Sequence, residues 1–249
     1  MTSLTKFNKK GFTLLELLIV VSIIAILSIA LVFMLNPTET LKKSRDAQRI
    51  SDLNTVKTAL GIMLTASSTP SLDNFGSVSS VCHTSTTYAG VTTLNTSPKI
   101  AYSIAAAAPT LSGTLTAGAD AANSTYTPGT APYAASVGST GKVDGTGWIP
   151  VSLKGLTGGT PISNFPVDPT NTVAGAATST DLVYRYACQN GTSATVGAGK
   201  PAYIFEIDAV LESNAYTVDD NKMVKDGGDN DRYYEQGNSL NLLPTTSNF

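Results

Sequence analysis

The sequence offers few side chains that could perform acid–base or nucleophilic chemistry. Its 249 residues include one histidine, His83, and two cysteines, Cys82 and Cys188. Cys82 and His83 are neighbours, and neighbouring residues on a strand point to opposite faces, so they are badly placed to act as nucleophile and base. The glycine-rich nucleotide-binding motifs and the nucleophile elbow are also absent from the sequence. We therefore expect no catalytic residue and predict that the protein is not an enzyme.

The two cysteines also restrict metal and redox chemistry. A zinc ribbon or an iron–sulfur cluster requires more thiolates than Cys82 and Cys188 supply. The two residues could instead form a disulfide that closes a loop of about 107 residues and stabilises the fold by roughly 4–5 kcal/mol. The alternative, two free thiols, stays open at this point.

Carboxylates gather near the carboxyl end of the chain, around Gly227-Gly228. Hard cations such as calcium prefer several oxygen ligands on a flexible loop, although the spacing here is not that of an EF-hand. Two interpretations follow: a calcium-stabilised loop or a solvated acidic turn. The four candidate ligands are Asp226, Asp229, Asp231 and Glu235.

Charge is scarce and nearly balanced along the chain. Only 14% of the residues are charged, with 16 Lys and Arg against 18 Asp and Glu and a formal net charge of −2. Proteins that bind nucleic acids usually carry a basic patch or stripe, so we expect no direct nucleic-acid binding. Hydrophobic residues make up 42% of the chain, which is enough to form a packed core.

The amino-terminal region divides into a basic leader and a long apolar run. Residues 1–11 are polar and carry three lysines without any acid, whereas residues 12–35 are almost entirely apolar. As a helix, this run would span about 36 Å, which is enough to cross a bilayer. It is too long for the apolar region of a cleaved secretory signal peptide. We therefore expect a membrane-spanning helix.

The orientation of this helix is less strongly encoded. The leader lysines favour a cytoplasmic amino end, but four cations also follow the apolar run. Long domains translocate largely regardless of charge, and the two cysteines suit an oxidising exterior. We expect the amino end inside and the carboxyl end outside. The four cations beyond the run are Lys42, Lys43, Arg45 and Arg49.

One residue of the apolar run is a carboxylic acid, Glu16. A carboxylate inside a membrane segment costs several kcal/mol unless it is paired or shallow. In one interpretation Glu16 lies at headgroup depth near the helix start, where the helix dipole helps it. In the other, Glu16 requires a cationic partner supplied by another chain.

The segment Lys9-Lys10-Gly11-Phe12-Thr13-Leu14-Leu15-Glu16-Leu17 resembles the type IV prepilin motif, because a basic leader, Gly, Phe, Glu and an apolar helix occur together at the right spacing. The resemblance implies that a prepilin peptidase cuts between Gly11 and Phe12 and methylates the new amine of Phe12. Glu16 would then pair with the Phe12 ammonium of a neighbouring subunit. The implied partners are identical subunits, the prepilin peptidase, the membrane, and a pilus assembly platform with its ATPase.

A second helix is predicted over residues 36–65. Asn36-Pro37 interrupts the apolar run, because proline cannot donate a helical hydrogen bond and disfavours helix in the residue before it. Thr38 is the expected N-cap. Apolar residues then recur every three or four positions, at Ile50, Leu53, Val56, Leu60 and Met63. The face expected to contact water carries Asp46, Arg49, Asp52 and Lys57.

Residues 66–249 are predicted to form a β-rich head. Strand patterns occur at 99–104, 147–153, 182–188 and 202–209. The last is the clearest, because Tyr203, Phe205 and Ile207 alternate with Glu206 and Asp208. The expected fold class is α+β. A long helical spine, apolar and then amphipathic, packs on a carboxyl-terminal antiparallel sheet.

The segment 164–170 adds a second resemblance. Its Pro-Val-Asp-Pro sequence is similar to the Pro-x-Asp-Pro segment that precedes a strand in major pseudopilins, although the Trp-Gly that often follows is absent. Major pseudopilins bind calcium in a carboxyl-terminal loop, and this likeness favours the calcium interpretation of the acidic cluster.

The function predicted from these patterns is mechanical. We expect a structural subunit of a type IV pilus-like extracellular filament, which is a single-pass membrane protein before assembly and extracellular afterwards. One alternative is a pseudopilin of a type II secretion or DNA-uptake system. A second alternative, from another class, is a monomeric, membrane-anchored surface adhesin or binding module.

Overall fold

The computed structural model describes residues 11–73, 81–83, 98–105, 115–121, 125–126, 133–136, 138–171, 181–191 and 201–245. The chain divides into two compact units, Met1–Lys42 and Lys43–Phe249. The leader prediction for residues 1–10 lies outside the described residues.

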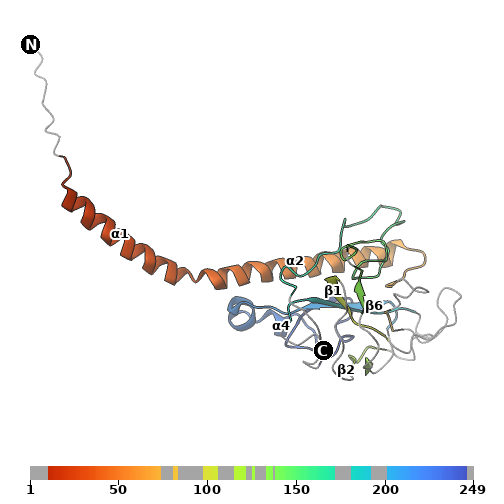
Figure 1. Cartoon of the computed structure of the whole chain (residues 1–249). Helices are drawn as coiled ribbons and strands as arrows, with labels where there is room; N and C mark the ends of the chain where they lie inside the picture. Colours follow the sequence, from red (N-terminus) through yellow and green to blue (C-terminus); the bar gives the residue numbers. More distant parts are fainter. Residues whose placement is uncertain are drawn as a thin grey trace, which may run out of the picture. The chain divides into compact units, whose positions relative to one another are not determined.

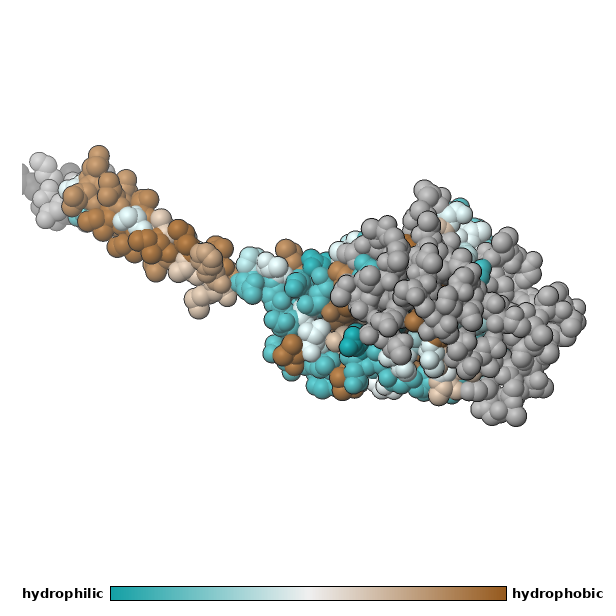
Figure 2. All heavy atoms as spheres, turned by 60° about the horizontal axis from the view of Figure 1, so that its bottom comes forward, coloured by the Kyte–Doolittle hydropathy of each residue, from teal (hydrophilic) through white to brown (hydrophobic). Residues whose placement is uncertain are grey.

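The first unit contains the apolar helix α1, Leu14–Leu35. None of its residues is buried, and hydrophobic side chains cover it in Figure 2. The hydroxyls of Ser22 and Ser28 donate to the carbonyls of Ile19 and Ile24, both at 2.7 Å, so these polar groups are satisfied within the helix. By length and composition, this helical region could cross a membrane.

Asn36 separates α1 from the second helix, α2, which spans Pro37–Ala66. Its backbone adopts a left-handed conformation with φ 37°. The Asn36 carbonyl accepts hydrogen bonds from the backbone N–H groups of Glu39 and Thr40. Proline at the first helical position loses no helical hydrogen bond. The predicted interruption is therefore confirmed, but the predicted N-cap, Thr38, is wrong because Asn36 takes that role.

The second unit is built on a five-stranded sheet with the order β4-β1-β5-β6-β7. Its strands are β1 Ala101–Ala105, β4 Tyr133–Ala135, β5 Tyr184–Gln189, β6 Ile204–Ala209 and β7 Tyr234–Gly237. Neighbouring strands are antiparallel except for β1 and β4. A separate hairpin-like pair joins β2, Leu115–Thr116, to β3, Thr125–Tyr126. The short helices η1, Ala215–Asp219, and α4, Lys222–Lys225, lie between β6 and β7 in the sequence. The predicted α+β class is confirmed.

Helix α2 lies along one face of this sheet (Figure 1). Its apolar stripe packs with the inward side chains of β5 and β6. A second apolar cluster covers the opposite face of the sheet and includes Tyr102, Tyr233 and Leu242. Every residue of β5 and β6 is therefore buried. The stripe residues that are fully buried are Leu53, Val56, Leu60 and Met63.

Two strand assignments differ from the sequence prediction. Residues 147–153 are buried except for Ser152, and they form no strand apart from an isolated bridge between Asp144 and Ser152. Pro150 has no N–H to give to a ladder, and the Trp148 indole instead donates to the Pro166 carbonyl at 2.8 Å. Conversely, β7 lies in the acidic region for which no strand was expected.

Cys82 and Cys188 form a disulfide. The short segment 81–83 lies beside the end of β5, because the His83 N–H donates to the Cys188 carbonyl at 2.8 Å and the Asn190 N–H donates to the His83 carbonyl at 3.0 Å. The Cys82 N–H also donates to the Asp73 carboxylate at 2.9 Å. The bond thus joins the region after α2 to a central strand of the sheet.

Replacing both cysteines with alanine should lower the free energy of unfolding by about 4–5 kcal/mol, because the unfolded chain regains the freedom of a loop of about 107 residues. Urea unfolding of the detergent-solubilised chain, followed by fluorescence of the buried Trp148, measures this change. Reductant should destabilise the wild type and leave the double variant unchanged. Equal urea midpoints for both proteins would contradict the prediction.

Candidate functional site

The predicted processing site lies just before α1. Gly11 and Phe12 precede the helix, and both are exposed. The Phe12 side chain is 86% exposed, and a Cβ added at Gly11 would meet no atom within 4 Å. The peptide bond between these residues is therefore accessible in the isolated chain.

The predicted assembly residue, Glu16, lies in the first turn of α1. Its backbone N–H donates to the Thr13 hydroxyl at 3.2 Å, while its carboxylate accepts the Thr13 N–H and hydroxyl, both at 2.9 Å. This reciprocal arrangement is a capping box, which satisfies two backbone donors at a helix start. In the isolated chain Glu16 thus stabilises the beginning of α1 and draws its partners from its own turn.

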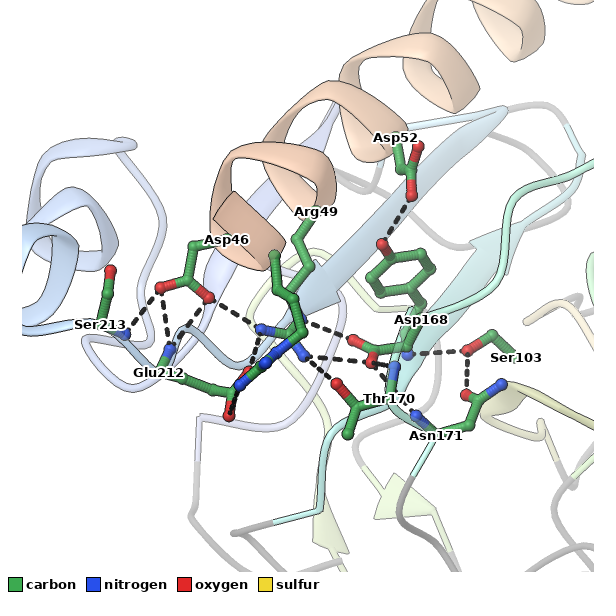
Figure 3. Close-up of polar contacts among 11 residues, drawn as sticks. Asp46, Arg49, Asp52, Ser103, Asp168, Thr170, Asn171, Glu212 and Ser213 are labelled. Atoms are coloured by element: carbon green, nitrogen blue, oxygen red, sulfur yellow. Dashed lines mark hydrogen bonds and ion pairs between the residues drawn. The ribbon is translucent and has the colours of Figure 1, made fainter. Parts of the chain in front are cut away.

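A network of polar contacts lies where α2 meets the head, around the buried guanidinium of Arg49 (Figure 3). Arg49 binds Asp168 through two parallel hydrogen bonds, Nε to Oδ2 at 2.7 Å and Nη2 to Oδ1 at 3.1 Å. Its Nη1 donates to Asp46 and to Glu212, both at 2.8 Å. Its Nη2 also donates to the Thr170 hydroxyl at 3.0 Å. We call these five residues the Arg49 cluster.

The carboxylates of this cluster are also held by backbone donors. Asp46 accepts the N–H groups of Glu212 at 3.0 Å and Ser213 at 2.7 Å. Asp168 accepts the N–H of Thr170 at 2.8 Å. Asp168 therefore binds Arg49 of α2 while its own loop closes around its carboxylate. Buried charges require this degree of pairing.

The electrostatics of the cluster follow from these contacts. Burial acts to lower the pKa of Arg49, but the hydrogen bonds that it donates to Asp168, Glu212 and Asp46 raise it above its ordinary value. Burial acts to raise the pKa of Glu212, but Arg45 and Arg49 hold it below its ordinary value. Glu212 and its two arginine partners therefore remain ionised at neutral pH.

Next to the cluster, Asp52 accepts a hydrogen bond from the Tyr184 hydroxyl at 2.8 Å. Burial raises the pKa of Asp52, and this hydrogen bond partly offsets the rise. Asp52 and Tyr184 thus form a second polar link between α2 and the sheet.

These contacts correct the predicted wet face of α2. Asp46, Arg49 and Asp52 are buried, and of the four charged positions only Lys57 is exposed. A helical pattern alone could not reveal this, because the partners that allow burial are distant in sequence. Asp168 is 119 residues from Arg49 and Glu212 is 163 residues away. The Pro-Val-Asp-Pro segment was the one available signal for Asp168.

The four predicted calcium ligands do not form one cluster. No three of them, all within the described residues, place ligand atoms within 4.8 Å of one another. Asp229 and Asp231 are exposed, whereas Glu235 is buried in β7. Asp226 accepts the N–H groups of Glu235 at 2.7 Å and Gly228 at 3.0 Å. Calcium binding by some of these acids stays a prediction.

Comparison with known proteins identifies the amino-terminal region. Residues 6–32 match the family model described as the prokaryotic N-terminal methylation motif, which is the signature of type IV pilins and pseudopilins. No match was found among curated proteins or among solved structures. The motif points to a structural protein and implies processing by a prepilin peptidase.

Replacing Arg49 with methionine should destabilise the head by about 3–5 kcal/mol, because Asp46 and Asp168 would remain buried without their cation. The urea midpoint measured by Trp148 fluorescence reports this loss. Lys57→Met removes an exposed charge from the same helix and should change stability by no more than about 0.5 kcal/mol. Similar midpoints for the two variants would show that the Arg49 cluster contributes little.

Proposed function

We propose that this protein is the structural subunit of a type IV pilus-like extracellular filament. It assembles through α1 after a prepilin peptidase removes residues 1–11 and methylates Phe12. The single observation that carries this proposal is the N-terminal methylation motif at residues 6–32. It coincides with a helix whose residues are all exposed.

The apolar side chains of α1 must be shielded from water by lipid or by other protein chains. The large hydrophobic side chains of α1 have exposed fractions between 47% for Ile19 and 87% for Met34. Leaving such a surface in water costs about 25 cal/mol for each Å². Lipid covers it before assembly, and the helices of neighbouring subunits cover it in a filament. The motif and α1 together indicate a membrane-anchored precursor that later becomes surface-exposed.

Cleavage would leave two complementary charges near the tip of α1. The new ammonium of Phe12 and the carboxylate of Glu16 are each costly alone among apolar helices. Pairing the amine of one subunit with Glu16 of the next would neutralise both and fix the register of the stacked helices, as a buried polar residue does in a coiled coil. Glu16 would then exchange its capping contacts with Thr13 for an intersubunit ion pair.

The charges that flank α1 support an N-in, C-out orientation. Beyond the helix, Arg45 and Arg49 are paired with Glu212 of the head. Among the described residues, Lys42 and Lys43 are the flanking cations that form no ion pair. The leader carries three lysines and no acid. This balance favours a cytoplasmic leader and a head outside the cell. An assembly platform and its ATPase would then extrude the assembled filament.

A pseudopilin of a secretion or DNA-uptake system is the second candidate. The observation in its favour is the Pro-Val-Asp-Pro segment, whose Asp168 binds Arg49 of the helix. Both candidates share the same processing and polymerisation. Filament length in electron micrographs distinguishes them, because a pseudopilus is short.

Replacing Gly11 with valine should block processing, because the motif places glycine directly before the cut. Gly61→Val is a matched control, since an added Cβ meets no atom within 4 Å at either position. Mass spectrometry of the membrane fraction should find residues 1–11 on the Gly11 variant and N-methyl-Phe12 at the start of the control. A mature amino terminus on both proteins would contradict the proposed cleavage site.

Replacing Glu16 should separate its charge from its capping role. Glu16→Gln can keep the capping box but has no charge, whereas Thr13→Ala removes the cap and keeps the charge. We expect Glu16→Gln and Glu16→Val to insert into the membrane but fail to form filaments, and Thr13→Ala to form them. Glu16→Val should insert more readily, by up to roughly 2.5–3.5 kcal/mol.

Electron microscopy of sheared filaments measures filament formation, and membrane fractionation measures insertion. Normal filament yield from Glu16→Gln would contradict the proposed ion pair and leave helix capping as the role of Glu16.

A further inference from the structure

Three carboxylates lie together inside the sheet, on the face that points away from α2. Asp208 of β6 is paired in register with Arg185 of β5 on one side and with Glu235 of β7 on the other. Glu206 lies two residues earlier on β6 and so shares that face. All three acids are buried, and their ligand oxygens lie within 4.8 Å of one another.

Asp208 is neutralised by Arg185. The guanidinium Nε donates to both oxygens of Asp208, at 2.8 and 3.1 Å, and Nη2 forms a further ion pair. The same guanidinium stacks on the Tyr233 ring, 3.8 Å from its centre. The ion pairs among the described residues provide no cation for Glu206 or Glu235. Two buried carboxyl groups therefore remain without a counter-charge.

Glu206 attaches the segment 242–244 to the sheet directly, and Glu235 does so through Asn230. Oε2 of Glu206 accepts the backbone N–H groups of Leu242 at 2.7 Å and Leu243 at 2.8 Å. Oε2 of Glu235 accepts the Asn230 N–H at 3.3 Å, and the Asn230 side chain donates to the Pro244 carbonyl at 3.0 Å. The other oxygen of Glu206, Oε1, is buried and has no hydrogen-bond partner in the described structure.

We propose that Glu206 and Glu235 share one proton, and that this proton makes the attachment of residues 242–244 to the sheet depend on pH. Two adjacent buried carboxylates cannot both stay ionised. Glu206 accepts two short backbone hydrogen bonds, which favour its charged form. Glu235 accepts one longer bond, so it is the acid, and its hydroxyl donates to the open oxygen of Glu206.

The pKa values move in the direction that this arrangement requires. Burial raises the pKa of Glu206, while Glu235 and the N–H groups of Leu243 and Leu242 partly offset the rise. Burial raises the pKa of Glu235, and the charge of Glu206 raises it further. At neutral pH the pair therefore keeps a proton that two exposed glutamates would have lost.

The other titratable groups around the pair supply no further positive charge that could neutralise both carboxylates. Burial raises the pKa of each nearby tyrosine, so these side chains stay neutral at and above neutral pH. The single histidine contacts Tyr126. The Asp226 carboxylate accepts a hydrogen bond from the backbone N–H of Glu235, and burial raises the pKa of Asp226. The facing groups are Arg185, Asp208, Asp226, His83, Tyr102, Tyr126 and Tyr233.

The sign of the pH effect follows from the raised pKa values. Both glutamates have an ordinary pKa of 4.5. A group whose pKa is higher in the folded state contributes stability that is complete below its unfolded pKa and is lost as the pH rises through its folded pKa. The head should therefore lose stability as the pH rises above about 5. The loss should continue until Glu235 ionises at its folded pKa of about 10 and a second negative charge is buried in the sheet.

The test is the thermal midpoint of the full-length chain in detergent micelles between about pH 5 and about pH 9. The wild-type midpoint should fall by at least about 3 °C over this range, the shift that roughly 1 kcal/mol produces in a domain of this size. Glu235→Gln should show a smaller fall, because an amide donates to Glu206 without titrating. The matched control, Asp231→Asn at an exposed position, should follow the wild type.

Infrared spectroscopy tests the proton directly and does not depend on any variant folding. The wild type should show a protonated carboxylic acid band at neutral pH that disappears on raising the pH, while hydrogen exchange at residues 242–244 accelerates. The absence of this band would overturn the proposal. So would a midpoint that calcium raises in the wild type at constant pH but not in Glu235→Gln, because a cation rather than a proton would then neutralise the pair.

Discussion

The buried guanidinium of Arg49 is the interaction on which the docking of α2 depends. It joins one turn of the helix to two loops that are far apart in sequence, through Asp168 and Glu212. Apolar packing by Leu53, Val56 and their neighbours supplies area but little direction. The bidentate pairing with Asp168 fixes the rotation and height of the helix, because planar guanidinium and carboxylate groups meet in one geometry.

The two helices meet the same physical requirement in different ways. The apolar stripe of α2 is covered by its own head, whereas no residue of α1 is buried in the described structure. Lipid or other subunits must therefore cover α1, as the proposed polymerisation through this helix would do. In such a filament, any load on α1 would reach the head along the continuous chain, through the helix that Arg49 holds in place.

Local sequence patterns predicted the elements whose causes are local. The break at Asn36-Pro37, the apolar and amphipathic helical patterns, and strands β1, β5 and β6 all arise from residue types within a short window. The α+β class followed from their order. Residues 147–153 were mistaken for a strand because burial without a ladder gives the same apolar pattern, and β7 was missed because its acidic surroundings indicated a turn.

The charged interior was beyond such patterns. The sequence pattern placed Arg49 and Asp46 on the solvent-facing side of α2, because their partners come from loops more than a hundred residues away. The alternation of Glu206 and Asp208 in β6 was recognised, but the second apolar layer that covers this face was not. Burial of charge is set by tertiary pairing, so it becomes predictable only when both partners are placed.

The most direct test of the proposed assembly is electron microscopy of filaments from cells that make this protein, with mass spectrometry of the filament subunit. We expect filaments composed of this chain, beginning at N-methyl-Phe12 and lacking residues 1–11. The protein found only as a membrane-bound monomer that retains the leader would contradict it.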